Sequence, residues 1–198
     1  ITEPLKDPMA GLGDLRRGKG NTHVVAHNEQ IMCLEEAHWP WTINADLETT
    51  GVLNYEGKLD CSMTAHPKVC PITGELLAFS YFSFEQPYLK YIRVSADGKL
   101  QQVEGIELPE MVMMHDFNIT RNFVIFMDLP LALDLELLST GIPFRFKRDK
   151  EARLGVLPRN GNSSEIRWFQ IDPCYVFHQV NSWEEDNTIV LIVSRQDS

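Results

Sequence analysis

Short runs of apolar and β-branched residues alternate with polar turn signals along most of the chain. The segments Tyr91–Val94 and Leu100–Val103 flank Asp97-Gly98, a dipeptide typical of a tight hairpin turn. Residues 22–35 repeat this pattern as two short strands around a polar turn at Asn28-Glu29. Short runs at such regular spacing are typical of all-β domains, so the sequence predicts an all-β fold.

Another hairpin pattern spans residues 113–131. Its first arm is expected to be a strand that ends near Thr120, followed by a turn at Arg121-Asn122 and a second strand rich in Phe, Val and Ile. His115 lies in the first arm. Considered alone, a histidine in an apolar strand is more often an ordinary half-buried residue than a functional one.

One leucine-rich segment, Leu129–Thr140, has a composition that also fits a helix. Its apolar side chains could belong to the core, to a substrate tunnel or to a surface that contacts a membrane. Core or tunnel is favoured, because membrane-binding surfaces need more apolar area and a basic rim.

Composition and charge limit the possible partners. The chain has 198 residues, 43% of them hydrophobic, which is enough to build a sizeable core. A net charge of −10 and a pI near 5.0 oppose binding to phosphate backbones and to anionic lipid headgroups. No nucleic-acid partner is therefore expected.

The chain's cysteines are sparse and contain no CxxC pair; they are Cys33, Cys61, Cys70 and Cys174. This usage favours a reducing compartment such as the cytoplasm. Cys70 is expected to be an unreactive loop residue, since no group near it in the sequence is arranged to lower its pKa. The acidic run Glu184-Glu185-Asp186 is expected to be solvated.

Three histidines occur in similar apolar surroundings: His66, His115 and His178. Their separations, 115 − 66 = 49 and 178 − 115 = 63 residues, are far too long for a zinc knuckle or for a helical histidine pair. The fold would have to bring them together. Sheets arranged radially around an axis could do so, because each sheet can present one inner side chain to the same point.

Several motifs, in this order and with these gaps, resemble the carotenoid cleavage oxygenase family, most of all the plant carotenoid cleavage dioxygenases. The motifs that carry the resemblance are Gly20-Asn21-Thr22, Ala65-His66-Pro67-Lys68-Val69, Pro87–Tyr91, His115-Asp116-Phe117, Phe126–Leu131, Ala152–Arg159 and Phe177-His178 with Asn181, Trp183 and Glu184. The resemblance extends over nearly the whole chain.

The resemblance implies a seven-bladed β-propeller with loop and helical insertions and a non-haem Fe(II) on its axis, held by four histidines. His66, His115 and His178 match the first three iron ligands, whereas the fourth histidine has no counterpart among the 198 residues. The chain is therefore expected to be the central portion, residues 1–198, of one propeller domain, lacking an N-terminal part and the C-terminal part with the fourth histidine. Alone it is expected to be inactive.

The resemblance also assigns roles around the iron. Glu36 matches a glutamate that accepts a hydrogen bond from the second histidine ligand, His115, which would fix the tautomer of that ring; the other interpretation of Glu36 is a solvated strand edge. Thr22 matches a residue that crowds an open position on the iron, although threonine is also simply a good strand former.

Two further residues match positions beside the substrate. Glu35 occupies a position that is lysine in stilbene-cleaving relatives, where it meets a phenolic oxygen, and a glutamate cannot make that interaction. Phe177 is expected to form part of the substrate wall, with an ordinary core role equally open.

The resemblance implies a dioxygenase that uses Fe(II) and O₂ to cleave a conjugated C=C bond of a carotenoid or apocarotenoid into aldehyde or ketone products. The expected partners are an apolar polyene or stilbene substrate and O₂. Peripheral contact with a membrane is a further option for substrate uptake, and an organelle is a further option for the location. Two alternatives stay open: a dioxygenase that cleaves stilbenes of the lignostilbene type, and a propeller remnant that only binds. Hydrolase and kinase functions lack their motifs in this sequence.

Overall fold

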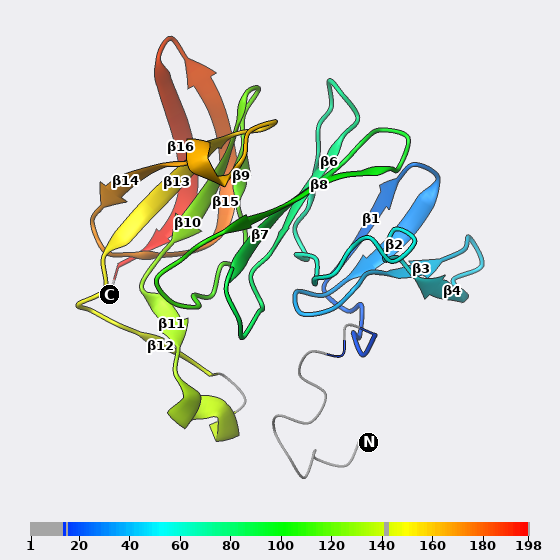
Figure 1. The fold of residues 1–198 in the computed structure, drawn as a ribbon, viewed down its shortest axis with the longest axis horizontal. Coiled ribbons are helices and arrows are strands. Elements are labelled where there is room, and N and C mark those ends of the chain that lie inside the picture. The colour runs from blue at the N-terminus through cyan, green and yellow to red at the C-terminus, as the bar shows by residue number, and fades with distance from the viewer. Residues whose placement is uncertain (1–13, 15, 141–142, 198) are drawn as a thin grey trace.

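The structure, a computed structural model, describes residues 14, 16–140 and 143–197. Three antiparallel four-stranded sheets follow one another along the chain, and a hairpin completes the row (Figure 1). The first sheet holds β1 (His23–His27), β2 (Gln30–Leu34), β3 (Trp41–Ile43) and β4 (Thr49–Val52); the second holds β5 (Lys68–Val69), β6 (Leu76–Ser80), β7 (Leu89–Val94) and β8 (Leu100–Ile106).

The third sheet has the strand order β14-β13-β10-β9, and the hairpin pairs β15 with β16. Their bounds are β9 (Asn118–Ile119), β10 (Phe123–Asp128), β13 (Ala152–Pro158), β14 (Arg167–Ile171), β15 (Tyr175–Glu185) and β16 (Thr188–Gln196). The chain between β10 and β13 forms the small pair β11 (Leu131–Leu133) and β12 (Phe144–Phe146), which projects below the sheets in Figure 1. Two short 3-10 helices, η1 (Leu135–Thr140) and η2 (Ser163–Glu165), complete the described elements.

The all-β class predicted from the sequence is confirmed. Both expected tight turns are present: Asn28 and Glu29 have φ of 46° and 61° between β1 and β2, and Gly98 has φ of 77° between β7 and β8. Positive φ at these positions is what the preferred two-residue and glycine-containing hairpin turns require. Among the described residues, no helix is long and apolar enough to cross a membrane.

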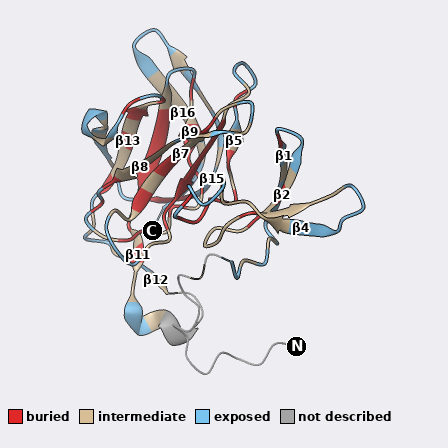
Figure 2. Cartoon of the chain, turned by 45° about the vertical axis from the view of Figure 1, so that its right-hand side comes forward, coloured by how far each residue is buried: buried red, intermediate tan, exposed pale blue. Residues whose placement is uncertain are grey.

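The middle strands of the second sheet are buried on both faces. All five residues of β6 are buried, and successive side chains point to opposite faces. Leu77 and Phe79 join a core shared with β10 and β13 of the third sheet, whereas Leu76 and Ala78 join a core shared with β2 of the first. Each sheet therefore packs face to face against its neighbours. Figure 2 shows the result, with burial concentrated along the middle strands and exposure at the hairpin tips.

Aromatic rings dominate the core between the second and third sheets. Phe79 is fully buried, and its ring centroid lies 5.1 Å from that of Phe117 and 6.3 Å from that of Phe126, both in tilted or edge-on geometry. Tyr91 meets Phe126 at 5.9 Å. Such pairs add to the transfer free energy of the buried rings, so this cluster stabilises the packing of the two sheets.

One prediction about local structure was wrong. His115 does not lie in a strand, because β9 begins only at Asn118 and the backbone before it bonds elsewhere: Met113 N donates to Leu131 O at 2.8 Å. In the leucine-rich segment, Leu129 is buried as expected for core, and the helical composition corresponds only to the short 3-10 helix η1, where Leu135 is 61% exposed.

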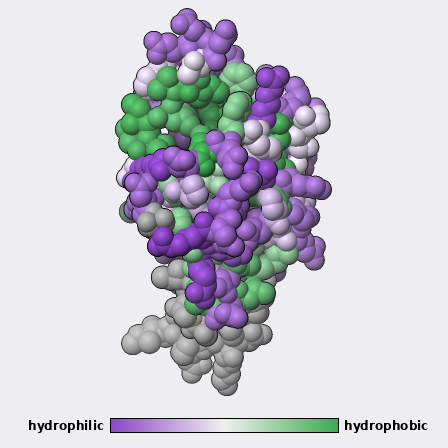
Figure 3. All heavy atoms as spheres, turned by 90° about the vertical axis from the view of Figure 1, so that its left-hand side faces the viewer, coloured by the Kyte–Doolittle hydropathy of each residue, from purple (hydrophilic) through white to green (hydrophobic). Residues whose placement is uncertain are grey.

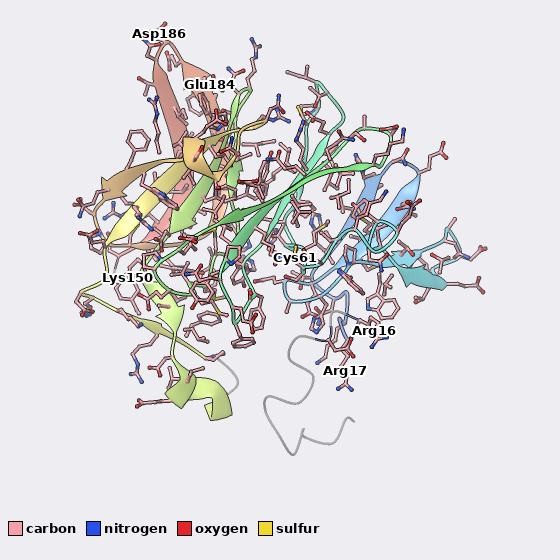
Figure 4. The ribbon with its side chains drawn as sticks, viewed as in Figure 1. Arg16, Arg17, Cys61, Lys150, Glu184 and Asp186 are labelled. Atoms are coloured by element: carbon pink, nitrogen blue, oxygen red, sulfur yellow. The ribbon has the colours of Figure 1, made fainter. Side chains whose placement is uncertain are left out.

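Glu184 is not simply solvated, unlike its neighbours in the acidic run. Its carboxylate accepts hydrogen bonds from the backbone N of Asn122 at 2.8 Å and from Asn122 Nδ2 at 2.7 Å. Glu184 and Asp186 mark the upper end of the β15–β16 hairpin in Figure 4. These hydrogen bonds attach the hairpin to the turn between β9 and β10, and so help to position the hairpin against the third sheet.

Arg159 and Cys70 join the second sheet to the third. The buried Arg159 Nη1 lies 3.4 Å from Cys70 Sγ and 3.3 Å from Arg121 O, while its Nη2 lies 3.6 Å from the Glu75 carboxylate. Burial alone would raise the pKa of the Cys70 thiol, but hydrogen bonds from Thr73 and Arg159 outweigh it and lower the pKa to about 7. The sequence did not indicate this lowered pKa, because Arg159 is 89 residues away from Cys70 and the hydrogen bonds from Thr73 depend on the folded loop. That the thiol is unreactive stays a prediction.

Replacing Phe79 by Ala should lower the free energy of unfolding by about 3–5 kcal/mol, since it empties a fully buried ring site. Phe169→Ala is the matched control. That side chain is 52% exposed on β14, so its loss should cost about 0.5 kcal/mol or less. Urea unfolding of both variants measures the difference, and equal losses would contradict the assigned core.

The Cys70 thiol should make stability depend on pH. Its pKa in the folded state is about 7, against an ordinary value of 9.0, so the unfolded chain binds more protons between these values. The free energy of unfolding should rise as pH increases from about 7 to about 9, and this contribution should be lost as pH falls through 7. Cys70→Ser should flatten that rise in urea titrations; an unchanged slope would exclude the ionised thiol.

Candidate metal centre

Three histidines meet from three different sheets. His66 lies two residues before β5, His115 lies three residues before β9, and His178 lies within β15. Both β5 and β9 are edge strands of their sheets. In β15 the pairing with β16 shifts register on either side of Gln179, and such a bulge re-aims the side chains beside it.

The imidazole nitrogens of these residues converge. His115 Nε2 lies 2.9 Å from His66 Nε2 and 3.2 Å from His178 Nε2, and the ligand atoms of all three residues lie within 4.8 Å of one another. The rings are set edge to face, with centroids 4.6 Å apart for His66 and His115 and 4.8 Å apart for His115 and His178. Three ring nitrogens facing one point form a group that could hold a metal ion.

The spacing and chemistry of the donors fit a divalent transition metal. Two nitrogens bound at ~2.1 Å to one ion would be roughly 3.0 to 3.4 Å apart, depending on the coordination geometry, and the two Nε2 separations of 2.9 Å and 3.2 Å are close to that range. Burial, opposed in part by the charge of Asp116, lowers the pKa of His66 to about 4. That ring is therefore neutral at pH 7 and keeps a lone pair for a metal.

Glu36 holds the second histidine from behind. Its Oε1 contacts His115 Nδ1, and its Oε2 accepts a hydrogen bond from the Tyr81 hydroxyl. A carboxylate at this position would favour the tautomer with a proton on Nδ1, in which the Nε2 lone pair of His115 faces the other two rings. Burial and the charge of Glu36 raise the pKa of Tyr81, which keeps the phenol protonated as a donor.

The other residues named from the sequence lie in different settings. Phe177 packs beside the group, with its ring 5.8 Å from that of His115 and 4.6 Å from that of Tyr175. Glu35 instead holds the loop before β1: it accepts from Lys19 N at 2.8 Å and contacts His38 Nδ1 at 2.9 Å. Its carboxylate is thus engaged within the first sheet.

Thr22 lies at the start of the first sheet, where its backbone N donates to Leu34 O at 3.0 Å. The residue after it, His23, reaches the site: its Nδ1 bonds Ala65 O at 2.8 Å, and its ring lies 6.0 Å from that of His66. These contacts bring the Thr22 segment alongside the first histidine of the group. The roles of Thr22, Glu35, Glu36 and Phe177 toward a metal or substrate stay predictions.

A cavity of about 880 Å³ lies elsewhere, between the third sheet and the β15–β16 hairpin. Apolar side chains of β10, β13 and β16 line much of it, including Phe123, Leu154 and Leu191, and none of the three histidines does. Figure 3 shows this side of the molecule, with apolar side chains gathered around a hollow. The cavity is therefore not a pocket for a substrate at the histidine group.

Comparison with known proteins gives the family. The profile of the family described as retinal pigment epithelial membrane protein matches residues 4–198. The chain belongs to this family. It is the carotenoid cleavage oxygenase family that the motifs predicted, and that prediction is confirmed.

Among curated members of the carotenoid cleavage oxygenase family, a carotenoid 9,10(9',10')-cleavage dioxygenase of Crocus sativus is 42% identical over 188 residues. The match covers 91% of this chain and 34% of that enzyme, so the chain spans about a third of its relative's length. The crystal structure of Pseudomonas brassicacearum lignostilbene dioxygenase superposes with a TM-score of 0.80 at 35% identity, over 88% of this chain and 38% of that one.

A second solved member is the cobalt-substituted apocarotenoid oxygenase of Synechocystis, with a TM-score of 0.77 and 25% identity over 96% of this chain and 42% of that one. A relative that accepts cobalt agrees with a metal centre in the family. The three converging histidines are where this carotenoid cleavage oxygenase chain could hold one.

Glu36→Gln should weaken metal binding by about 10- to 100-fold, the usual effect of losing the carboxylate behind a ligand histidine. The control is Glu184→Gln, which alters another half-buried glutamate that accepts two hydrogen bonds but contacts Asn122 instead of a histidine. Chelator competition with Co(II) measures both affinities in the complete protein that carries this sequence. Equal affinities for the two variants would contradict the role of Glu36.

Proposed function

We propose that the protein carrying this chain is a non-haem Fe(II)-dependent dioxygenase that cleaves a conjugated C=C bond of a carotenoid or apocarotenoid. The observation that carries the proposal is the convergence of His66, His115 and His178 from three sheets. Support comes from family membership and from the 42% identity with a carotenoid cleavage dioxygenase.

The chain forms, in this proposal, the central portion of one seven-bladed propeller domain. It spans 34% of the Crocus sativus enzyme, and its sheets stack face to face as propeller blades do. A fourth histidine and further glutamates behind the ligands would then come from outside these 198 residues. Such a centre would use neutral imidazoles alone, a donor set that suits Fe(II).

The reaction balances without an added reductant or proton. One C=C bond breaks, and each of its two carbons takes one oxygen atom of O₂ to give two carbonyl products. Bound iron supplies the one-electron chemistry that lets O₂ react with a closed-shell polyene. No residue of the chain needs to act as a nucleophile or as a general acid.

The chain's own residues prepare the site. Glu36 and Tyr81 fix the His115 ring in the tautomer that presents Nε2 to the centre. Phe177 offers an apolar face beside His115, suited to a polyene that must be held with one particular bond over the metal. Thr22 is proposed, from the family resemblance alone, to restrict the space beside the metal.

We also propose a cytoplasmic location, in keeping with four free cysteines in the described structure.

Stilbene cleavage is the second candidate, favoured by the TM-score of 0.80 with lignostilbene dioxygenase. Against it, the resemblance matches Glu35 to a position where stilbene-cleaving relatives have a cation that meets a phenolic oxygen, and this carboxylate is engaged by Lys19 N and His38.

The test uses the complete protein, expressed with iron and incubated under ¹⁸O₂ with a panel of carotenoids, apocarotenoids and stilbenes. We expect stoichiometric iron and aldehyde or ketone products from polyenes, with label in both carbonyls. His178→Ala should lose iron, whereas His27→Ala should keep it, because the His27 ring bonds Gly74 O outside the group.

Iron with cleavage of stilbenes alone would overturn the carotenoid assignment in favour of the second candidate. Protein that contains no iron and cleaves nothing would leave a propeller that only binds.

A further inference from the structure

A buried carboxylate lies directly behind the three histidines. Asp116, the residue after His115, is 2% exposed. Its Oδ1 accepts from Lys68 Nζ at 2.7 Å and from Phe117 N at 2.9 Å, and its Oδ2 lies 3.3 Å from Gln179 N. A carboxylate buried this deeply is costly unless it is paired and hydrogen-bonded, and these donors supply both.

The donors come from the segments that carry the other two histidines. Lys68 is two residues after His66, at the start of β5, and Gln179 directly follows His178 in β15. The Gln179 side chain also donates to Phe117 O, two residues after His115. One carboxylate is therefore bonded, directly or through one residue, to all three histidine segments.

These hydrogen bonds of Asp116 connect strands that are not paired with one another. β5, β9 and β15 belong to three separate sheets, so backbone ladders do not set their relative positions. The pairing of β15 with β16 is irregular at the point of contact, which leaves the backbone around His178 with fewer ladder constraints. A bond from Asp116 to Gln179 N fixes the backbone at that irregularity.

We propose that Asp116 is a positioning residue that sets the mutual placement of His66, His115 and His178, with Lys68 and Gln179 as its anchors. The inference rests on the proposed metal centre. Without the carboxylate, the three segments lose their common anchor, and the nitrogens no longer converge as a preorganised set of ligands. Metal affinity then falls although every ligand is still present.

The chain offers a matched control for simple loss of a buried charge. Asp128 at the end of β10 is fully buried and pairs with Lys150 Nζ at 2.8 Å and Arg153 Nε at 2.8 Å. Lys150, labelled in Figure 4, and Arg153 lie just before and within β13. Asp128→Asn should lower stability much as Asp116→Asn does, but without touching a histidine segment.

The experiment measures the Co(II) dissociation constant by chelator competition, the visible spectrum of bound Co(II), and urea unfolding, all in the complete protein. Asp116→Asn should weaken Co(II) binding by about 10- to 100-fold and shift the cobalt bands. Asp128→Asn should change stability alone. Lys68→Met combined with Asp116→Asn should weaken binding no further than Asp116→Asn, because Lys68 acts through Asp116.

Equal Co(II) affinity and unshifted bands in Asp116→Asn would overturn the inference. If Asp116→Asn yields no folded protein, Gln179→Leu decides: weaker Co(II) binding supports the anchor, and unchanged binding overturns it. Failure of the proposed function looks different, because the unaltered protein would then bind no Co(II) at the histidines.

Discussion

The structure depends on sheets that are apolar on both faces. A strand such as β6, buried at every position, is stable only if other sheets cover both of its sides. The first and third sheets cover the two faces of the second. An aromatic core lies between the second and third sheets, and another core lies between the first and second. Stacking of this kind brings the edges of successive sheets together, and the histidines lie at those edges.

Convergence alone would give a loose group of histidines, and two carboxylates make it specific. Glu36, from the first-sheet region, contacts one ring, while Asp116 joins the segments that carry all three histidines. Both carboxylates contact these segments on the side away from the Nε2 atoms, and the Phe177 ring lies 5.8 Å from that of His115.

Local signals predicted the local structure well. The turns at Asn28-Glu29 and Asp97-Gly98 are encoded by a few neighbouring residues, and the structure has both. His115 was placed in a strand because its neighbours are apolar, but apolar residues are also buried in extended segments that bond to a different sheet, as Met113 does with Leu131. Periodicity cannot separate these cases.

The site could be predicted only through the family resemblance, since separations of 49 and 63 residues carry no local signal. The partners behind the ligands were missed for the same reason. Tyr81 is 45 residues from Glu36, and Lys68 is 48 residues from Asp116. The one available hint was that each histidine has a polar residue within two positions of it, at Lys68, Asp116 and Gln179.

We propose that His66, His115 and His178 bind one metal ion through their ring nitrogens. X-ray absorption at the iron edge of the complete protein is the decisive measurement. We expect a nearest shell of nitrogen donors with the outer-shell scattering typical of imidazole, and a loss of that scattering in His115→Ala. A shell dominated by sulfur or carboxylate oxygen, or a spectrum that His115→Ala leaves unchanged, would contradict it.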